Sequence, residues 1–221
     1  EIQRKMTREQ LHRYSERLAL YLRMLLQKRG SKNKLYSLHE SHVYCMSKGK
    51  AHKRYEFGTK ASITTTRDSG IIIGALAFDK NIFDGHTVPA VLAQVKRLIG
   101  RVPSVGIGDR GYRGKSKVND TQIVTPKRAR KNASTEAMAL ARKRFRRRAG
   151  IEPVIGHLKS DHRLNRNFLK GFAGDQINLI MVAAAFNFKK WMREVIFWLK
   201  KLQQIKRVLK NSFFRTGMAL A

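Results

Sequence analysis

Cysteine, acidic residues and long apolar runs are all scarce in this 221-residue sequence. Cys45 is the single cysteine, which excludes a disulfide framework and a multi-cysteine zinc site within one chain. The longest unbroken apolar run, 179–186, has eight residues, whereas a membrane-spanning helix needs about 20. No Gly-x4-Gly-Lys-Ser/Thr motif occurs, so nothing predicts nucleotide hydrolysis. These absences favour a cytoplasmic protein with neither a membrane nor a nucleotide as partner.

The charge is strongly one-sided. Lys and Arg number 47 against 15 Asp and Glu, which gives a net charge of +32, while 42% hydrophobic residues can supply a core. Such a surplus predicts a polyanionic partner, and nucleic acid fits better than a membrane because the longest apolar run is too short to span one. The densest basic segment is 127–148, where Glu136 is the only acid. A solvated basic face is the alternative to DNA contact for its candidate residues, which are Lys127, Arg128, Arg130, Lys131, Arg144, Arg146 and Arg147.

Local patterns predict an α/β architecture. A capping box at Thr7 and Gln10 begins a helix over 7–29, and 31–51 has the composition of a connecting loop. β-Branched residues predict a hairpin of strands 55–66 and 70–78. The expected elements after the hairpin are a helix over 88–99, strands over 102–108 and 122–125, a helix from about 134, and an amphipathic helix or helix pair over 177–209. This order predicts a mixed sheet with helices on its faces.

Asp109 is the first candidate for chemistry. It stands in GDRGYRG, 108–114, immediately after an expected buried strand, and open α/β sheets bind ligands at such strand ends. The alternative is an aspartate with a purely structural role in a glycine-rich turn.

Glu152 is the second candidate. On an ideal helix it shares one stripe with Phe145, Arg148 and Lys159, beside an apolar stripe that could hold the helix on the sheet. Pro153 indicates that a helix begins or kinks at this point. The alternative is that Glu152 only pairs with Arg148 one turn earlier. Two acids among cationic residues would suit phosphodiester chemistry with Mg²⁺, commonly two ions, because magnesium prefers carboxylate and water oxygens.

The string Phe145-x2-Arg148-x3-Glu152-x6-Lys159 resembles the Tyr-x2-Arg-x3-Glu-x6-Lys signature of insertion-sequence DDE transposases. The resemblance extends over most of 34–188, and it is carried by KLYSLHESHVYCMSKGKAHKRYEFG, DGHT, GDRGYRG and NFLKGFAGDQINLIMVAAAFNF. Phe145 departs from the signature, which has tyrosine at this position. Phenylalanine can still stack on a base or sugar, but it has no hydroxyl to donate.

The resemblance implies a bacterial, nucleoid-associated enzyme that cleaves and transfers DNA strands, with double-stranded DNA of the transposon ends and the target as its partner. Asp109 and Glu152 would be catalytic metal ligands for Mg²⁺ or Mn²⁺, and Arg148 and Lys159 would contact DNA or support the site. Homo-oligomers on DNA are an additional expectation.

The implied fold is a ribonuclease H-like mixed sheet, with a helical insertion at 1–34, a partial catalytic domain at 35–175 and carboxyl-terminal helices at 176–221. In this family the first acid lies on a strand upstream of a helical insertion. The sequence is therefore expected to lack that strand and its aspartate, and to be inactive alone.

Other readings stay open. Asp79 and Asp84 are the best-placed substitutes for the first acid, although a turn and a helix cap also account for them. His39-x2-His42-x2-Cys45 has metal-ligand types at short spacing but no obvious fourth ligand. The rival function is a noncatalytic, basic nucleic-acid-binding remnant of a transposase.

Overall fold

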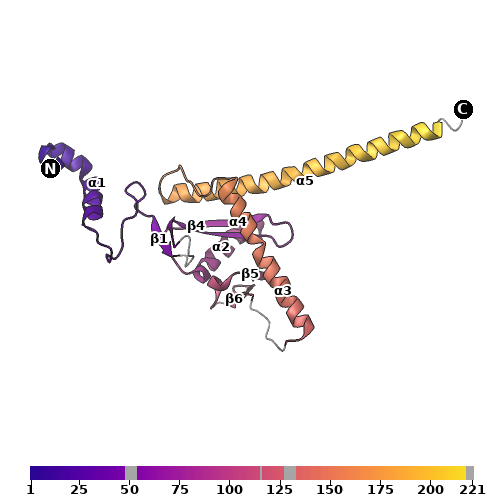
Figure 1. The fold of residues 1–221 in the computed structure, drawn as a ribbon, viewed down its shortest axis with the longest axis horizontal. Helices are drawn as coiled ribbons and strands as arrows, with labels where there is room; N and C mark the ends of the chain where they lie inside the picture. The colour runs from indigo at the N-terminus through magenta and orange to yellow at the C-terminus, as the bar shows by residue number, and fades with distance from the viewer. Residues whose placement is uncertain (48–53, 115, 127–132, 218–221) are drawn as a thin grey trace.

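The computed structural model describes residues 1–47, 54–114, 116–126 and 133–217, and it is a mixed α/β structure. α1 lies at the amino-terminal end of the molecule, and α5 projects from the other side as one long helix toward the carboxyl terminus (Figure 1). The helices and strands are η1 (Ile2–Lys5), α1 (Arg8–Leu26), β1 (Tyr44–Ser47), β2 (Tyr55–Gly58), β3 (Lys60–Thr65), β4 (Ile72–Phe78), α2 (Asp84–Ile99), β5 (Val105–Ile107), η2 (Arg110–Tyr112), β6 (Lys117–Val118), β7 (Thr121–Val124), α3 (Thr135–Ala149), α4 (Ile151–Ser160) and α5 (Gly171–Gly217).

The capping box that predicts the first helix is confirmed. Thr7 Oγ1 accepts the Gln10 N–H at 3.3 Å, and the Gln10 side chain accepts the Thr7 N–H at 3.0 Å. α1 ends at Leu26 rather than near residue 29, and none of its residues is buried. Its helical form therefore depends on its own capping and side-chain spacing more than on tertiary packing.

The predicted hairpin forms, with one division that the sequence pattern did not predict. β3 pairs with β4 in antiparallel register from Lys60 opposite Phe78 to Thr64 opposite Gly74. The expected strand 55–66 is divided at Gly58, whose φ of 145° is a conformation that favours glycine. Its first part, β2, pairs with β1 instead. Part of the expected loop 31–51 is thus a strand, because β1 gains its ladder partner only in the folded chain.

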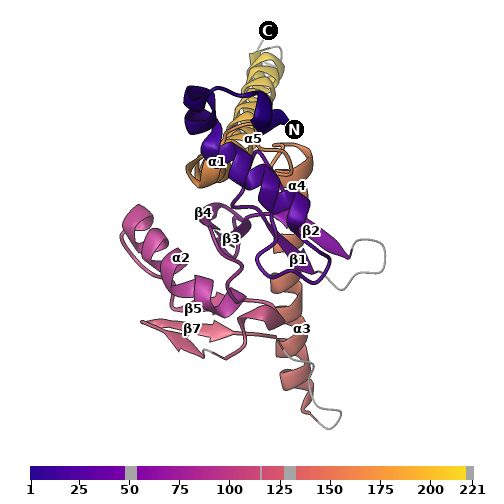
Figure 2. The ribbon, with the colours of Figure 1, turned by 90° about the vertical axis from the view of Figure 1, so that its left-hand side faces the viewer.

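β4 lies between two helices, α2 on one face and α5 on the other (Figure 2). On the α2 side, a Cβ at Gly74 would lie 3.0 Å from the Val95 side chain, so the glycine allows close approach. The core on the other side joins β4 to α4 and α5, and its buried members are Ile72, Ala75, Ala77, Leu158, Leu179, Val182 and Ala183.

The strands after α2 form a separate sheet. β5 pairs with β7 in parallel and β6 pairs with β7 antiparallel, so this sheet is mixed. The sequence predicts a mixed sheet, and among the described residues the strands form three small sheets. There β3 pairs with β4 alone and β5 pairs with β7 alone, so no strand joins these ladders into one sheet.

Three helices complete the structure. Ser134 caps α3 through the Ala137 N–H, at the point where the sequence predicts a helix to begin. The chain leaves α3 at Gly150 and starts α4 at Ile151, so the predicted interruption near Pro153 is confirmed. α5 is one helix of 47 residues rather than a pair. No helix among the described residues is long and apolar enough to span a membrane.

Candidate functional site

Asp109 lies directly after β5, where the chain turns into η2. Its carboxylate accepts the Gly111 N–H at 2.8 Å and caps this short helix. Gly108 has no room for a side chain, because a Cβ there would lie 2.8 Å from the Tyr112 ring. Asp109 therefore has the turn role that its glycine-rich surroundings predict, and its side chain is nevertheless exposed to solvent.

Asp84 is the acid that the fold brings beside Asp109. A Cβ on Gly111 would collide with Asp84 Oδ2 and lie 3.0 Å from Asp109 Oδ1, so the two carboxylates meet at this glycine. Asp84 Oδ1 is also 2.8 Å from Lys60 Nζ. The interpretation of Asp84 as a helix cap is wrong, because Phe83 holds the cap position and Asp84 is the first helical residue, with its carboxylate engaged by lysine.

Tyr112 lies close enough to both acids for their charges to act on it. Its hydroxyl lies 3.4 Å from Ser62 Oγ, and Ser62 and Thr87 are themselves buried. Burial raises the pKa of Tyr112, and the charges of Asp84 and Asp109 raise it further, against the lowering effect of its hydroxyl partners. The sequence could suggest this group only through DGHT and GDRGYRG, since their convergence depends on how α2 packs.

Glu152 begins α4 and pairs with Arg148 at the end of α3. The predicted single stripe is thus divided between two helices by Gly150, and the simple i,i+4 pairing proposed as the alternative does form. The Glu152 side chain is 63% exposed, while Arg148 Nε is buried without a hydrogen-bond partner. Glu152 is therefore accessible but electrostatically neutralised by its neighbour.

The apolar side of α4 anchors it as predicted. Leu158 is fully buried in the core, and Val154 packs against the same cluster. Lys159 is exposed on α4, and Phe145 is half-buried on α3. Burial of Leu158 fixes the orientation of α4 and thereby the side on which Glu152 lies.

The two converging carboxylates are of the chemical type that binds a divalent cation, but two protein ligands are fewer than a metal site needs. Oxygen donors from Asp84 and Asp109 converge, which suits Mg²⁺ or Mn²⁺. No group of three or more His, Cys, Asp or Glu side chains within the described parts of the chain is placed to hold a metal ion. Asp109 and Glu152 come from β5 and α4, and Glu152 has Arg148 as its partner.

A protein-family model for the transposase DDE domain matches residues 31–188. The chain belongs to this family. The matched span contains both Asp109 and Glu152, and it ends within α5. Searches of curated proteins and of solved structures found no match. DDE transposases generally use divalent metal ions, so the oxygen donors described above are the relevant ones to test.

Basic side chains gather on α3 of this chain. Arg146, Arg147 and Arg148 occupy its last turn, and exposed Arg144 lines a small pocket between α3 and the end of β7. The other predicted DNA contacts, Lys127, Arg128, Arg130 and Lys131, lie outside the described residues.

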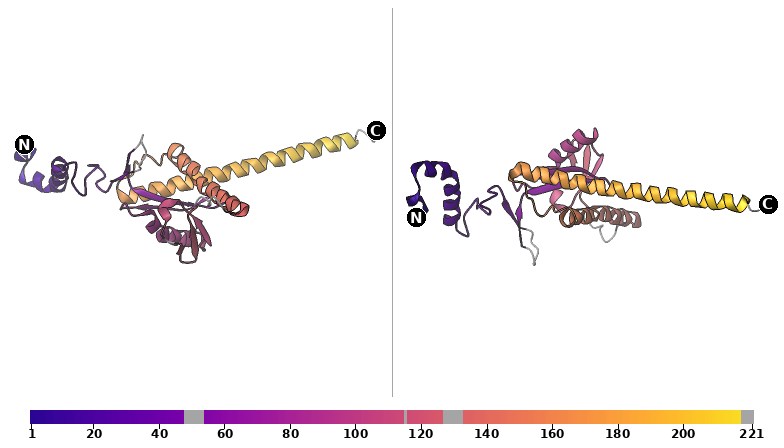
Figure 3. Two further views of the ribbon diagram at one scale, coloured as in Figure 1. Left: turned by 60° about the horizontal axis from the view of Figure 1, so that its bottom comes forward. Right: turned by 90° about the horizontal axis from the view of Figure 1, so that it is seen from above.

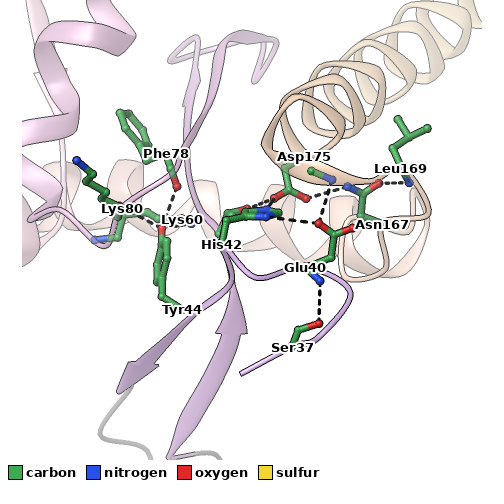
Figure 4. A network of polar contacts seen from close by, with 12 residues as sticks. Ser37, Glu40, His42, Tyr44, Lys60, Phe78, Lys80, Asn167, Leu169 and Asp175 are labelled. Atoms are coloured by element: carbon green, nitrogen blue, oxygen red, sulfur yellow. Dashed lines mark hydrogen bonds and ion pairs between the residues drawn. The ribbon is translucent and has the colours of Figure 1, made fainter. Parts of the chain in front are cut away.

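His42 takes part in a carboxylate network (Figure 4). Its Nε2 is 3.0 Å from Asp175 Oδ2, and its Nδ1 is 3.4 Å from Glu40 Oε2. Thr59 and Asn167 donate hydrogen bonds to Asp175 at 2.9 and 2.8 Å. This network ties the segment before β1 to the start of α5, which assigns His42 a structural role that its spacing to Cys45 did not predict.

Asp79, the other substitute considered for the first acid, lies exposed after β4 and near Tyr44. The Tyr44 hydroxyl donates toward the carbonyls of Phe78 and Lys80 and accepts from the Lys60 N–H. Burial raises the pKa of Tyr44, and the Asp79 charge contributes to the rise. Asp79 thus belongs to the strand-end turn that its sequence position predicts.

Asp161 joins α4 to α5. It accepts hydrogen bonds from Ser160 at 2.7 Å and Lys189 at 3.2 Å, and His157 Nδ1 lies 3.1 Å away. The Ser160 and Lys189 bonds, with a smaller contribution from His157, lower the pKa of Asp161 to about 2. The contact helps to hold the helix that carries Glu152.

Gly111→Ala should destabilise the chain and displace the carboxylates of Asp84 and Asp109, because the new methyl group collides with one and crowds the other. We expect a loss of about 1 kcal/mol in the free energy of unfolding, the low end for overpacked sites, because the atoms it meets are the ends of two solvent-exposed side chains that can shift. Denaturant unfolding measures it. Gly156→Ala is the control, since open space surrounds Gly156 within α4 and alanine favours a helix by about 1 kcal/mol. Equal effects of both changes would contradict the proposed collision.

Asp161→Asn should lower stability at neutral pH and have little effect near pH 2. The pKa in the folded state is lowered from 3.8 to about 2, so the stabilisation is present above pH 3.8 and is lost as the pH falls toward 2. Thermal unfolding of both proteins at several pH values measures this difference. Asp120→Asn, in an exposed turn, is the control, and a difference for Asp161→Asn that does not change with pH would refute the assignment.

Proposed function

We propose that this chain supplies two metal-binding acids, Asp109 and Glu152, to a transposase that cleaves and transfers DNA strands. The observation that carries the proposal is the family match, which spans both acids and the basic helix between them. A bound cation would activate the attacking oxygen and stabilise the leaving one. The nucleophiles would be water in cleavage and then the freed 3′ hydroxyl in transfer.

The other predicted residues act around these acids. Arg148 holds the Glu152 carboxylate until DNA or metal competes for it, while Lys159 from α4 and Phe145 from α3 contact the substrate. Arg144, Arg146 and Arg147 bind backbone phosphates, which positions DNA without reading its sequence. With DNA as partner, we expect association of copies on DNA and a location at the bacterial nucleoid.

We also propose a ribonuclease H-like arrangement of the sheets. Gln94, Gln176 and Asn187 occupy the edge of β4 that faces away from β3. In the described residues β3 and β5 each have a single strand partner. A further strand between β3 and β5 would join the sheets and could bring a third acid beside Asp109. Without such an acid, the 221-residue chain alone should not cleave DNA with Mg²⁺ or Mn²⁺.

The rival function, a noncatalytic nucleic-acid-binding remnant, draws support from the Glu152–Arg148 pair, because a carboxylate neutralised by arginine needs no metal. The two functions differ in what the acids do to DNA binding. In a pure binder they only repel phosphate, whereas in a catalytic site they recruit a cation that bridges to it.

Mn²⁺ should raise the affinity of the wild-type chain for duplex DNA several-fold, and Asp109→Asn with Glu152→Gln should abolish that gain. Fluorescence anisotropy with a labelled duplex measures it. Asp120→Asn with Glu136→Gln removes the same charge from exposed positions elsewhere, and this control should keep the gain. If neutralising Asp109 and Glu152 tightens binding equally with and without Mn²⁺, the remnant function is correct.

DNA affinity should also fall steeply with salt, because a +32 chain displaces counterions from phosphates. Six or more phosphate contacts predict a loss of about a thousandfold or more between about 50 and 200 mM salt. The slope of log Kd against log salt concentration gives the number of contacts. An affinity independent of salt would exclude binding through the phosphate backbone.

A further inference from the structure

α5 has two apolar faces, and among the residues that the structure describes only one of them packs against the rest of the chain. The inner face packs against β4 through Leu179, Val182, Ala183 and Phe186. Beyond this contact the helix extends clear of the other elements, as the views in Figure 3 show. The helix therefore presents its remaining apolar side chains to solvent over most of its length.

The second face follows a strict seven-residue repeat. Its residues recur at alternating spacings of four and three, and all are exposed apart from half-buried Val195. They are Ile177, Met181, Ala184, Phe188, Trp191, Val195, Trp198, Leu202 and Ile205. On a straight helix such a repeat drifts by about 20° per heptad, so it suits a partner helix that supercoils with it better than a flat surface.

The repeat is large enough for a stable interface. Phe188, Trp191 and Trp198 are each more than half exposed, and a fully covered aromatic side chain buries about 150–250 Å². The six rings of two copies, together with their aliphatic neighbours, would reach the roughly 1,000 Å² that distinguishes specific interfaces.

Charge order selects the direction of pairing. Glu194 is the only acid between 189 and 208, among seven basic residues. A parallel in-register pair would place Lys201 beside Lys206 of the second copy, and their like charges would repel. An antiparallel pair centred between Ile196 and Phe197 instead brings Glu194 and Lys201 of the second copy together as diagonal neighbours along one flank of the seam, twice by symmetry.

The antiparallel alignment also matches the apolar residues. Phe188 lies opposite Ile205 of the second copy and Trp191 opposite its Leu202, while the central layers combine Val195 with the bulky ring of Trp198. Met192 and Leu199, both exposed in the single chain, meet at the flank of this seam. Polar flanking positions therefore form ion pairs and apolar ones contact each other in the same register.

We propose that α5 forms an antiparallel, two-stranded coiled coil with α5 of a second copy of this chain over residues 188–205. The paired segment is 18 residues, or about 27 Å, of helix. The contact does not involve Asp109 or Glu152, so it can be tested separately from catalysis.

Sedimentation equilibrium of the full chain, freed of nucleic acid, tests the proposal. We expect a dimer. Lys201→Glu makes two carboxylates neighbours across the seam at both symmetric positions and should weaken dimerisation on the order of tenfold. Lys200→Glu makes the same charge change on the opposite side of the helix and should leave the dimer unchanged. Combining Glu194→Lys with Lys201→Glu reverses both charges and should restore wild-type dimerisation.

Trp191→Glu should abolish the dimer without unfolding the chain, because Trp191 is 58% exposed in the single copy; circular dichroism verifies retained helix. A monomeric wild-type chain, a charge reversal that fails to restore pairing, or equal effects of Lys200→Glu and Lys201→Glu would overturn the proposal. A monomer that binds anionic phospholipid vesicles through α5 would also overturn it, in favour of a membrane-surface helix.

Discussion

Satisfaction of the β4 backbone is the constraint on which the structure depends. One edge of β4 is paired with β3, and on the other edge side-chain amides act as a substitute strand. Gln94 bonds both the N–H and the C=O of Ala75, and Asn187 does the same for Ile72. A buried backbone group left unpaired costs about 1–3 kcal/mol, so these side-chain amides contribute to stability by removing that cost along the free edge of β4.

The same amides couple the two helices that flank the strand. Gln94 comes from α2, and Gln176 and Asn187 come from α5, so both helices are fixed in register along β4 as well as by apolar packing. The register of α2 sets the position of Asp84 at its first turn, facing Asp109. The relative position of Asp84 and Asp109 therefore depends on β4, a strand that itself carries no residue of the candidate site.

How far the sequence predicts this structure depends on the range of each interaction. The Thr7 cap, the hairpin that ends in β4 and the helix restart near Pro153 each rest on patterns of residues close together in the sequence, and each is confirmed. Local patterns also locate Asp109 at a strand end and pair Glu152 with Arg148.

The features that local patterns could not predict depend on contacts between residues far apart in the sequence. β1 has no strand signal of its own and depends on pairing with β2. Asp84 has the sequence of a helix cap, and only the packing of α2 turns its carboxylate toward Lys60 and Gly111. The division into separate sheets likewise reflects which strands are available to pair, a property that periodicity within one strand does not contain.

Charge links DNA binding to the association of two copies. Each chain carries +32, so bringing two copies together opposes strong mutual repulsion, and a single acid at Glu194 relieves little of it. Phosphates bound to α3 would neutralise part of that charge and reduce the repulsion. If DNA binding favours dimerisation, the dimer must bind DNA more tightly than two separate chains do. The reason is that the coupling free energy between the two events is the same in both directions. Apolar residues on α5 would thus supply the attraction between two copies, and bound DNA would lower the charge repulsion enough for the dimer to form.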